Sequence, residues 1–590
     1  MVCRPILLVL CPFLFACTMN DTGQVHEGTS PNVVLILTDD QGWGDLSING
    51  NTNLATPNID KLGKEGAIFD HFYVCPVCSP TRAEILTGRY HLRGGVYDTS
   101  EGGERLDLDE VTIAQYFKEA GYKTAGFGKW HNGMQYPYHP NGRGFDEFYG
   151  FCSGHWGNYF SPMLEHNGAI VKGEGFIIDD LTDKAISFAE ESADHPFFLY
   201  LPFNTPHGPM QVPDQWWNKF QSKSLELKHR QPEKEDTLNT KAALAMCENI
   251  DWNVGRLNQK LSDLGLLENT IIIFLSDNGP DRFRWNGGMK GKKGDVDEGG
   301  VRSPMMIYWK DHIIPGTTIS NIASAIDILP TLVDLTGIGT SFRNPIDGIN
   351  LTPLIMGEQP DSWDRLVYNY WNKKIGVRSQ NYLLDKDNNL YDMISDPGQY
   401  EVINTHNPEI LSSLIEAKEH WKAEVMSELP EKDLRTFPVG HPEFRYTQIP
   451  ARDGIATGSI RRSNRWPNCS FYTNWVNVED SIYWDVEVMS AGQFAVDLYY
   501  TCPESDLGSR FSISFLENAL EGTIDTAHDP PLTGMENDRY PRGNSYVKDF
   551  KMKEVGTIDL REGEGRLVLK ALEKPGSQVM DFRLLMLRRV

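Results

Sequence analysis

Residues 32–40 read NVVLILTDD, and residues 270–278 read TIIIFLSDN. In each segment a run of apolar residues ends in a pair of side chains that carry oxygen atoms. A strand that is apolar throughout is buried on both faces, as the central strands of a parallel sheet are. The two segments are therefore predicted to be central strands of such a sheet, with the polar pairs at their carboxyl ends.

Around these segments, from residue 31 to residue 357, short β-rich runs alternate with amphipathic helical patterns. The other predicted strands are 123–128, 196–203 and 303–309, and the predicted helices are 111–120, 181–190, 243–264 and 326–335. Strands that alternate with helices indicate a sheet covered by helices on both faces. The predicted fold class is α/β, with a large mixed, mostly parallel sheet sandwiched by helices.

The pattern changes after the α/β domain, which indicates further units. Residues 358–426 combine short strands with a helix at 408–425 and predict a small α+β subdomain of the same unit. Residues 427–450 carry four prolines and little periodicity, which is typical of a linker. Residues 451–590 show β patterns separated by Gly, Pro and Asp turns, and they predict an all-β sandwich.

The charge of the chain limits the kinds of partner. The 590 residues carry a formal net charge of −25, which argues against nonspecific nucleic-acid binding, because that needs a basic surface. The same charge offers no long-range attraction to an anion, so an anionic substrate would need local basic groups. No segment after the first twenty residues is apolar enough to span a bilayer.

The first 17 residues have the pattern of a signal peptide, with a basic start at Arg4 and an apolar run at 6–16. Residues 14–17 read LFAC, which is close to a bacterial lipobox, in which the cysteine (here Cys17) is lipidated. The alternative is ordinary signal cleavage slightly downstream. Both interpretations predict export, to the periplasm or to a lipid-anchored position at the bacterial cell envelope.

The nine cysteines are irregularly spaced, which is typical of neither a disulfide scaffold nor a zinc site. One pair, Cys469 and Cys502, is considered as a bridge.

Residues 78–89 read CSPTRAEILTGR. Pro80 suits the first turn of a helix, with Ser79 as its cap, so Cys78 would lie at the positive end of the helix dipole. Arg82 lies four residues after Cys78 on the same helical face, where it can bind the same anion. For C-x-P-x-R alone, the competing interpretation is a buried cysteine before a Pro-capped helix.

The whole segment resembles the signature of the type I, formylglycine-dependent sulfatases of the alkaline phosphatase superfamily. That signature is C-x-P-S/T-R followed by A-x-L-x-T-G-R, and Ile85 stands in place of its usual leucine. The resemblance runs from Asn32 to about Asn404 and includes bacterial polysaccharide sulfatases. It implies that a formylglycine-generating or other maturation enzyme converts Cys78 to formylglycine, which is the nucleophile.

The polar pairs at the two strand ends supply three carboxylates and one amide, and such oxygen donors suit Ca²⁺ better than a transition metal. Ligands of α/β sheets bind outside the carboxyl ends of the strands. Each pair alone would more often be a turn or a helix cap. The resemblance implies that Asp39, Asp40, Asp277, Asn278 and the modified Cys78 hold one calcium ion.

Three further segments match family motifs in order: GKWH at 128–131, PHGP at 206–209 and EGGVR at 298–302, the last preceded by a group of lysines. The resemblance implies that Arg82, Lys129 and Lys293 bind the sulfate ester. His207, helped by Lys293, would protonate the leaving oxygen, and His131 would accept the proton of the second formylglycine hydroxyl. A lone histidine or lysine at such a place is more often a surface or packing residue.

The other two lysines of this group, Lys290 and Lys292, are predicted to be solvated. Asp297 departs from the family pattern, because relatives usually carry an aromatic residue there.

Residues 152–160, after a family hallmark at 144–150, are predicted to line the substrate pocket. His155, Trp156 and Arg284 are the candidate sugar contacts, and packing is the alternative for each. In the sandwich, Trp466, Tyr472, Trp475 and Trp484 give an outline similarity to carbohydrate-binding modules, and burial is the alternative. These features favour a sulfated polysaccharide or oligosaccharide, such as ulvan, carrageenan or a glycosaminoglycan.

Two other functions compete with a sulfatase. One is a phosphodiesterase or phosphonate monoester hydrolase of the same superfamily, and the EGGVR and LTGR segments favour sulfatase over it. The other is a non-catalytic protein that binds sulfated glycans on the same fold.

Overall fold

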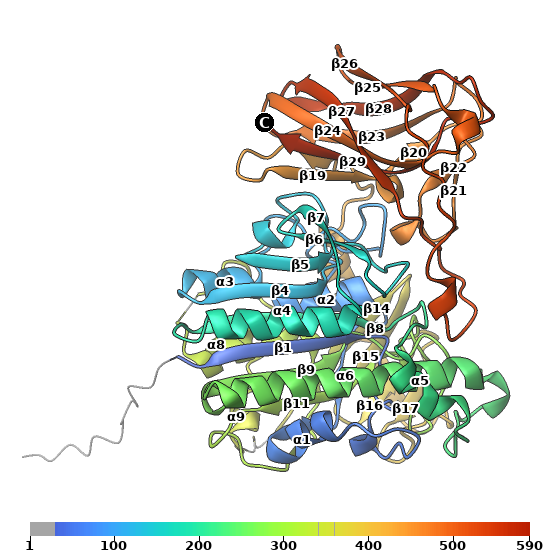
Figure 1. Ribbon diagram of the computed structural model, residues 1–590. Coiled ribbons are helices and arrows are strands. Elements are labelled where there is room, and N and C mark those ends of the chain that lie inside the picture. The colour runs from blue at the N-terminus through green and yellow to red at the C-terminus, as the bar shows by residue number, and fades with distance from the viewer. Residues whose placement is uncertain (1–29, 340, 359, 361) are drawn as a thin grey trace, which may run out of the picture.

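The computed structural model describes residues 30–339, 341–358, 360 and 362–590. The expected signal peptide at residues 1–17, with the lipidation candidate Cys17, lies outside the described residues. Figure 1 shows an α/β domain with an all-β domain stacked on it, and the C-terminus in the all-β domain. Within the described part of the chain, no helix is both long enough and apolar enough to cross a membrane.

The α/β domain is built on a ten-stranded sheet. The strands lie in the order β12 (Thr317–Ile319), β2 (Ala67–Phe69), β11 (Met305–Tyr308), β9 (Thr270–Ser276), β1 (Asn32–Asp39), β8 (Phe197–Pro206), β4 (Lys123–Lys129), β5 (Glu147–Phe151), β6 (Met163–His166) and β7 (Ala169–Lys172). From β9 to β5 neighbouring strands are parallel, whereas β11 and β6 run antiparallel to their central neighbours. The sheet is mixed with a parallel centre, as predicted.

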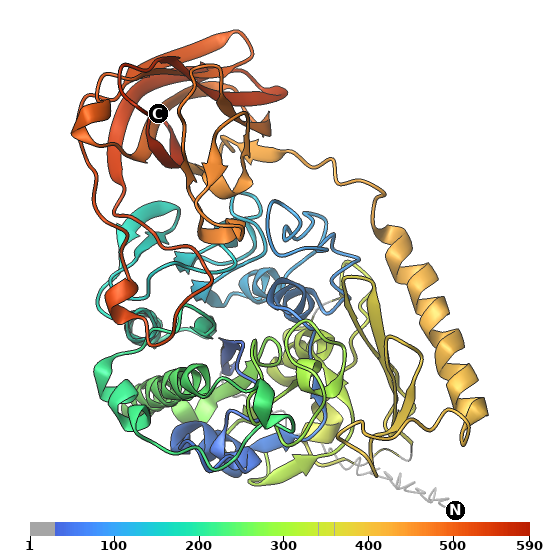
Figure 2. The same cartoon turned by 90° about the vertical axis from the view of Figure 1, so that its right-hand side faces the viewer.

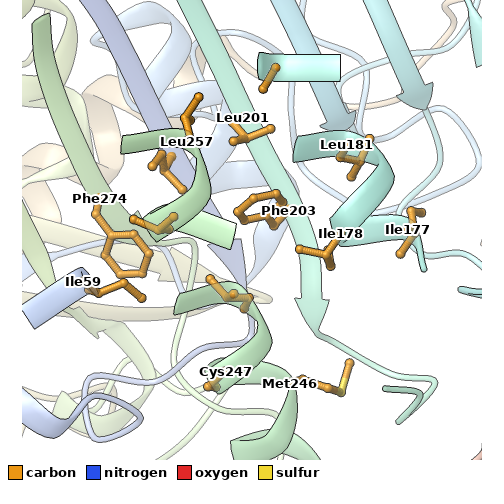
Figure 3. Close-up of a cluster of buried hydrophobic side chains, with 14 of the residues drawn as sticks. Ile59, Ile177, Ile178, Leu181, Leu201, Phe203, Met246, Cys247, Leu257 and Phe274 are labelled. Atoms are coloured by element: carbon orange, nitrogen blue, oxygen red, sulfur yellow. The ribbon is translucent and has the colours of Figure 1, made fainter. Parts of the chain in front are cut away.

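Helices cover both faces of this sheet. In β1, Val34 and Ile36 belong to the core on one face, and Val33, Leu35 and Leu37 to the core on the other, because successive side chains of a strand alternate. The first face is covered by α1 (Pro57–Glu65), α4 (Ile177–Glu191), α5 (Asp214–Gln221) and α6 (Thr237–Asp263). The second is covered by α2 (Cys78–Thr87), α3 (Ile113–Glu119), α8 (Ile328–Thr336) and α9 (Thr352–Ile355). Figure 3 shows labelled side chains of β8, β9, α1, α4 and α6 gathered in the core of the first face, and the predicted α/β class is confirmed.

A small subdomain leans on this core. Its antiparallel sheet consists of β14 (Val367–Trp371), β15 (Lys374–Arg378), β16 (Tyr382–Leu384) and β17 (Leu390–Asp392), and it is followed by α10 (Pro408–Val425). Trp421 of α10 packs with ring centres 5.2 Å from both Tyr90 and Tyr368. A three-stranded sheet of β10 (Arg302–Ser303), β3 (Phe72–Tyr73) and β13 (Ala323–Ser324) lies within the large domain, and the short helix α7 (Glu298–Val301) leads into β10.

The C-terminal domain is the predicted β-sandwich. One sheet has the order β18 (Phe437–Val439), β23 (Ser481–Val488), β28 (Gly563–Glu573), β25 (Arg510–Phe515) and β26 (Asn518–Thr523), with β20 (Ile455–Ala456) on β23. The other has the order β21 (Arg461–Arg462), β22 (Tyr472–Thr473), β29 (Asp581–Arg589), β24 (Gly492–Thr501) and β27 (Lys551–Leu560), with β19 (Tyr446–Pro450) on β29. The two sheets enclose one apolar core.

The linker expected at residues 427–450 is shorter than predicted. The strands β18 and β19 fall inside it and pair with β23 and β29, so the sandwich begins at Phe437. Pro438 is tolerated because β18 lies at the edge of its sheet, where a missing N–H breaks no ladder. Proline content alone therefore overstated the length of the linker.

The bridge considered between Cys469 and Cys502 is not formed. Both residues are buried free thiols, and so are the other cysteines in the described residues.

The sandwich is fastened to the α/β domain by a buried charge pair and by a long loop. Arg452 forms an ion pair with Glu104 of the α/β domain, and both side chains are almost fully buried. The loop at 524–550, between β26 and β27, leaves the sandwich and descends along the α/β domain (Figure 2). Its Tyr540 hydroxyl donates to Asp236 at 2.7 Å. The two domains therefore share an interface made of specific buried and polar contacts.

Candidate active site

The polar residues that follow four neighbouring strands meet at one edge of the central sheet. Asp39 ends β1, Lys129 ends β4, His207 follows β8, and Asp277 follows β9. The order β9, β1, β8, β4 makes these strands adjacent and parallel, so their carboxyl ends lie side by side. Asp40 sits directly after β1 with a positive φ of 65°, which turns the chain out of the strand.

Helix α2 carries the candidate nucleophile as its first residue. The helix begins at Cys78, and its N-cap is Val77, which makes no side-chain cap bond, so the prediction of Ser79 as the cap is wrong. Thr81 replaces that anchor, since its hydroxyl donates to the Asp277 carbonyl at 2.6 Å and accepts from the Cys75 amide at 2.9 Å. Cys78 is buried at the positive end of the helix dipole.

Beside Cys78 lies a floor of three carboxylates paired with three cations. Arg82 donates to Asp277 at 2.8 Å, Lys129 donates to Asp39 at 2.7 Å, and Lys293 pairs with Asp40. We call these six side chains together with Cys78 the floor. Its formal charge is close to zero before any ion binds, so a divalent cation would make it attractive to an anion.

The carboxylates of the floor are crowded enough to shift one another's pKa. Burial and the neighbouring Asp39 carboxylate raise the pKa of Asp277. Burial opposes the charge of Asp39 as well, but attraction by Lys129 and other cations outweighs it and holds the Asp39 pKa well below its usual range. A bound cation would relieve the repulsion that drives the two values apart.

The floor fits a hard metal ion. Oδ1 of Asp39 and Oδ1 of Asn278 are buried without a hydrogen-bond partner, which is costly unless a ligand satisfies them. Ligand atoms of Asp39, Cys78 and Asp277 lie within 4.8 Å of one another. With Asp40 beside them, the donors are almost all oxygen, the set that calcium prefers.

Three histidines line the same pocket as Cys78. His131 is buried, and its Nε2 lies 2.8 Å from the Thr99 carbonyl, so in the neutral ring Nε2 carries the proton and Nδ1 keeps a free lone pair. Burial and Lys129 lower the pKa of His131 well below its usual range, so the ring stays neutral. His207 directs Nδ1 to the Gly208 carbonyl at 2.8 Å, and its ring stacks on that of His155 with centres 5.9 Å apart.

Above the floor is a pocket of about 560 Å³. The α/β domain contributes Asp40, Cys78, His131, His155, His207 and Lys293. The small subdomain contributes Trp371, and the sandwich contributes residues of two loops, 465–468 and 540–544. Four of the six predicted catalytic residues therefore line this pocket: Cys78, His131, His207 and Lys293. The other two, Arg82 and Lys129, are buried in the floor, where they pair with Asp277 and Asp39.

Two of the three candidate sugar contacts lie elsewhere. Arg284 is buried, holds Asp45 with contacts of 2.6 and 2.8 Å, and donates to the Asp40 carbonyl at 2.7 Å, so it supports the floor from behind. Trp156 stacks on Phe151 with ring centres 5.1 Å apart and packs against the core. Neither lines the pocket, whereas His155 does.

The three lysines near the EGGVR segment have different contacts. The Lys290 side chain is 38% exposed, as predicted for a solvated lysine, and it also pairs at 3.1 Å with Asp297, which is buried. Lys292 donates to the Asp281 carbonyl at 2.8 Å. Only Lys293 of these three lines the pocket among the described residues.

Sequence reasoning missed much of the pocket wall. Asp98 and Thr99, Trp371, and most of the sandwich residues carry no motif and no telling spacing. Trp466 was named, but nothing in the sequence separates it from the buried Trp475 and Trp484.

Comparison with known proteins agrees with this geometry. A family model described as Sulfatase matches residues 31–338, which is more than half of the chain. This chain belongs to the sulfatase family. A second model, N-sulphoglucosamine sulphohydrolase C-terminal, matches residues 292–435. Neither model reaches the sandwich.

Individual relatives of this sulfatase extend the comparison. It is 31% identical to N-acetylgalactosamine-6-sulfatase of Mus musculus, over 58% of this chain and 68% of that protein. It is 34% identical to arylsulfatase A of Homo sapiens, over 55% of this chain and 68% of that protein. The crystal structure of Ps i-CgsB in complex with k-i-k-neocarrahexaose matches with a TM-score of 0.62 and 31% identity, over 68% of this chain and 96% of that one. The sulfatase is a sulfuric ester hydrolase.

Proposed function

We propose that this sulfatase removes sulfate from a sulfated polysaccharide or its oligosaccharides, by covalent catalysis through a formylglycine at residue 78 and with one calcium ion. The observation that carries the proposal is the floor, where Cys78 at a helix N-terminus faces paired carboxylates and three cations. Such a site suits an anionic group whose charge must be held while a bond to sulfur breaks.

An unmodified cysteine fits this chemistry poorly. Burial raises the pKa of the Cys78 thiol above its usual range, so the side chain would be a protonated thiol near neutral pH. A thiolate is the nucleophilic form of cysteine, and a sulfated thiol would have no second hydroxyl with which to expel sulfate. Hydrated formylglycine has two hydroxyls on one carbon and meets both needs.

In the first step, one hydroxyl oxygen of the hydrated formylglycine forms a bond to sulfur while the bond from sulfur to the ester oxygen breaks. The attacking hydroxyl loses its proton to a carboxylate of the floor. His207, helped by Lys293, gives a proton to the leaving alcohol oxygen. Arg82, Lys129 and Lys293 balance the charge of the sulfuryl group.

In the second step, the other hydroxyl loses its proton to His131, the bond from carbon to the sulfated oxygen breaks, and the aldehyde forms again as sulfate leaves. The free lone pair on Nδ1 of His131 supports this role, because Nε2 is committed to the Thr99 carbonyl at 2.8 Å. The aldehyde then takes up water for the next cycle.

Asp39, Asp40, Asp277, Asn278 and the modified residue 78 would hold the calcium ion. When bound, the ion supplies positive charge that orients the sulfate ester and stabilises charge on its oxygens.

The substrate class rests on the pocket and on one neighbour. The pocket holds about 560 Å³, and its lining combines polar and apolar side chains from the α/β domain and the sandwich, which suits a sugar chain better than a small aryl ester. Ps i-CgsB, whose crystal structure is a complex with k-i-k-neocarrahexaose, is a structural neighbour. Ulvan, carrageenan and glycosaminoglycans remain the proposed sources, and the N-terminal pattern supports an exported enzyme, periplasmic or lipid-anchored through Cys17.

The test is sulfate release from hexasaccharides of carrageenan, ulvan and chondroitin sulfate, by protein expressed with a formylglycine-generating enzyme. We expect release from at least one of them, and for 4-nitrophenyl esters a kcat/KM that is higher with sulfate than with phosphate. A phosphate or phosphonate ester cleaved faster than its matched sulfate would instead favour the phosphonate monoester hydrolase alternative.

A further inference from the structure

The sandwich forms one side of the active-site pocket, although the two family models stop at residues 338 and 435. Its contribution comes from two loops. The loop at 463–469, between β21 and β22, brings Arg465, Trp466 and Asn468 to the pocket. The loop at 524–550, which descends along the α/β domain in Figure 2, brings Tyr540 and Asn544.

The first loop is held against the α/β domain, beside His131, by buried polar contacts. Arg452, paired with Glu104, also donates to Oδ1 of Asn468 at 2.9 Å. Asn468 in turn donates to the Thr99 carbonyl at 3.1 Å, the same carbonyl that His131 contacts. Because Asn468 and the proposed catalytic His131 bind the same carbonyl, this loop is fixed in position relative to the nucleophile.

The second loop is held beside His207. Asn544 donates to the Gly208 carbonyl at 3.3 Å, and the Arg539 amide donates to the Met210 carbonyl at 2.8 Å. The two loops also meet, because Asn464 donates to the Gly543 carbonyl at 3.1 Å. The sandwich side of the pocket, formed by the loops at 463–469 and 524–550, is therefore one connected surface, which we call the wall.

On this wall, two side chains remain free to bind a ligand. Trp466 is 47% exposed, while Trp475 and Trp484 of the same domain are buried in its core. The Arg465 guanidinium lies 4.7 Å from the centre of the Trp466 ring and forms no ion pair within the described part of the chain. Cations and carboxylates both line the pocket, since Arg282, Arg542 and Lys293 occur there with Asp40, Asp98 and Asp281.

We propose that Trp466 and Arg465 form a subsite for the sugar unit next to the one that bears the scissile sulfate. Trp466 offers a ring face for stacking on a sugar, and Arg465 offers a planar cation for a second sulfate or a carboxylate on that unit. The ligand class is an anionic oligosaccharide of at least two units. This inference rests on the proposed function and deepens it.

The experiment compares two substrates for each variant, all in the full-length matured enzyme. Trp466→Ala and Arg465→Gln are measured by kcat/KM on the hexasaccharide that the wild type desulfates fastest, and on 4-nitrophenyl sulfate, which is too small to reach the subsite. We expect each variant to lose about tenfold or more on the hexasaccharide, equivalent to about 1.4 kcal/mol. Activity on 4-nitrophenyl sulfate should stay within about twofold of wild type, a ratio worth less than about 0.5 kcal/mol.

Matched controls come from the same chain. Trp252→Ala removes a tryptophan that is 39% exposed on α6, and Arg461→Gln removes an exposed arginine of the sandwich that does not line the pocket. Both should leave the two activities unchanged. Trp466→Phe keeps an aromatic ring and should retain most of the hexasaccharide activity, which separates stacking from a loss of structure.

The outcomes decide separate points. Equal losses on both substrates, or no loss on the hexasaccharide, would overturn the subsite while leaving the sulfatase proposal intact. If the wild type cleaves 4-nitrophenyl sulfate but none of the hexasaccharides, the proposed substrate class is wrong and the subsite falls with it.

Discussion

The floor and the sandwich wall of the pocket are built on opposite principles. In the floor, buried charges are matched one to one, as between Arg82 and Asp277, and they leave no freedom of position. On the wall, Trp466 is exposed and Arg465 is unpaired within the described residues, so both are free to meet a ligand. The contrast indicates that reaction chemistry requires a preorganised, dry site, whereas recognition of a variable sugar chain requires surface that is satisfied only on binding.

The metal proposal tests the floor with the largest expected effect. Removal of calcium with a chelator should lower sulfatase activity by about 10³-fold or more, because the floor then loses the charge that attracts and orients the sulfate ester. Calcium should restore activity better than magnesium, since the site offers more oxygen ligands than magnesium commonly takes from protein. Full activity in protein shown to be metal-free by elemental analysis would contradict the proposal.

Two neighbouring lysines, Lys292 and Lys293, test whether the catalytic role belongs to the one lysine that pairs with a carboxylate of the floor. Lys293→Ala should lower kcat by about 10²–10⁴-fold, the range typical of acid–base catalysis, because Lys293 pairs with Asp40 and lines the pocket. Lys292→Ala is the control, since the Lys292 ammonium contacts the Asp281 carbonyl and the Phe283 ring rather than a carboxylate of the floor, and the variant should keep near-wild-type rates. Similar rates for the two variants would show that the assignment within the lysine group is wrong.

The interface tests whether the wall depends on its attachment. Arg452→Ala leaves Glu104 buried without its cation, and such a loss costs about 3–5 kcal/mol. We expect a lower midpoint of thermal unfolding and a larger loss of activity on the hexasaccharide than on 4-nitrophenyl sulfate. Arg452 also pairs with the buried Asp453 at 3.1 Å, so the matched variant is Arg452→Met with Glu104→Gln and Asp453→Asn, which removes all three charges and should recover much of the stability. If it recovers none, the pair does not hold the domains together as inferred.

The smallest effect concerns pH. Burial raises the pKa of Glu84 in α2 to about 8, so the folded protein prefers the protonated carboxyl. Stability from that proton is fully present below the ordinary pKa of 4.5 and is lost as the pH rises towards 8. Glu84→Gln cannot ionise, and between pH 5 and pH 9 it should lose less stability than wild type, by about 1.4 kcal/mol for each pH unit between the two pKa values that this range spans. Parallel unfolding curves across this pH range would contradict the assigned ionisation.

The floor and the wall also differ in how far they could be predicted from the sequence. The floor was predictable because apolar runs mark central strands, and polar residues directly after Leu37 and Leu275 must then share one edge of the sheet. The short signature at Cys78 added the nucleophile, although Thr81 rather than Ser79 anchors the start of its helix.

The wall could not be predicted, because its position depends on contacts between domains. Trp466 lies more than 380 residues after Cys78 and reaches the pocket only through the packing of Arg452 and Asn468. The prediction that Arg284 contacts a sugar failed for a related reason. Arg284 pairs in the interior with Asp45, which is distant in the sequence. Burial of a charged side chain depends on a partner that no local pattern reveals.

One measurement tests the formylglycine most directly: mass spectrometry of the tryptic peptide 65–82 from protein expressed with a formylglycine-generating enzyme. The peptide contains Cys75 as well as Cys78, so Cys75 serves as an internal control that alkylating reagent should still modify. We predict that the mass of residue 78 is lower than that of cysteine by the difference between a CH₂SH group and an aldehyde. The fraction of peptide with this lower mass should rise in proportion to sulfatase activity. An alkylated Cys78 in fully active enzyme would contradict the proposed nucleophile.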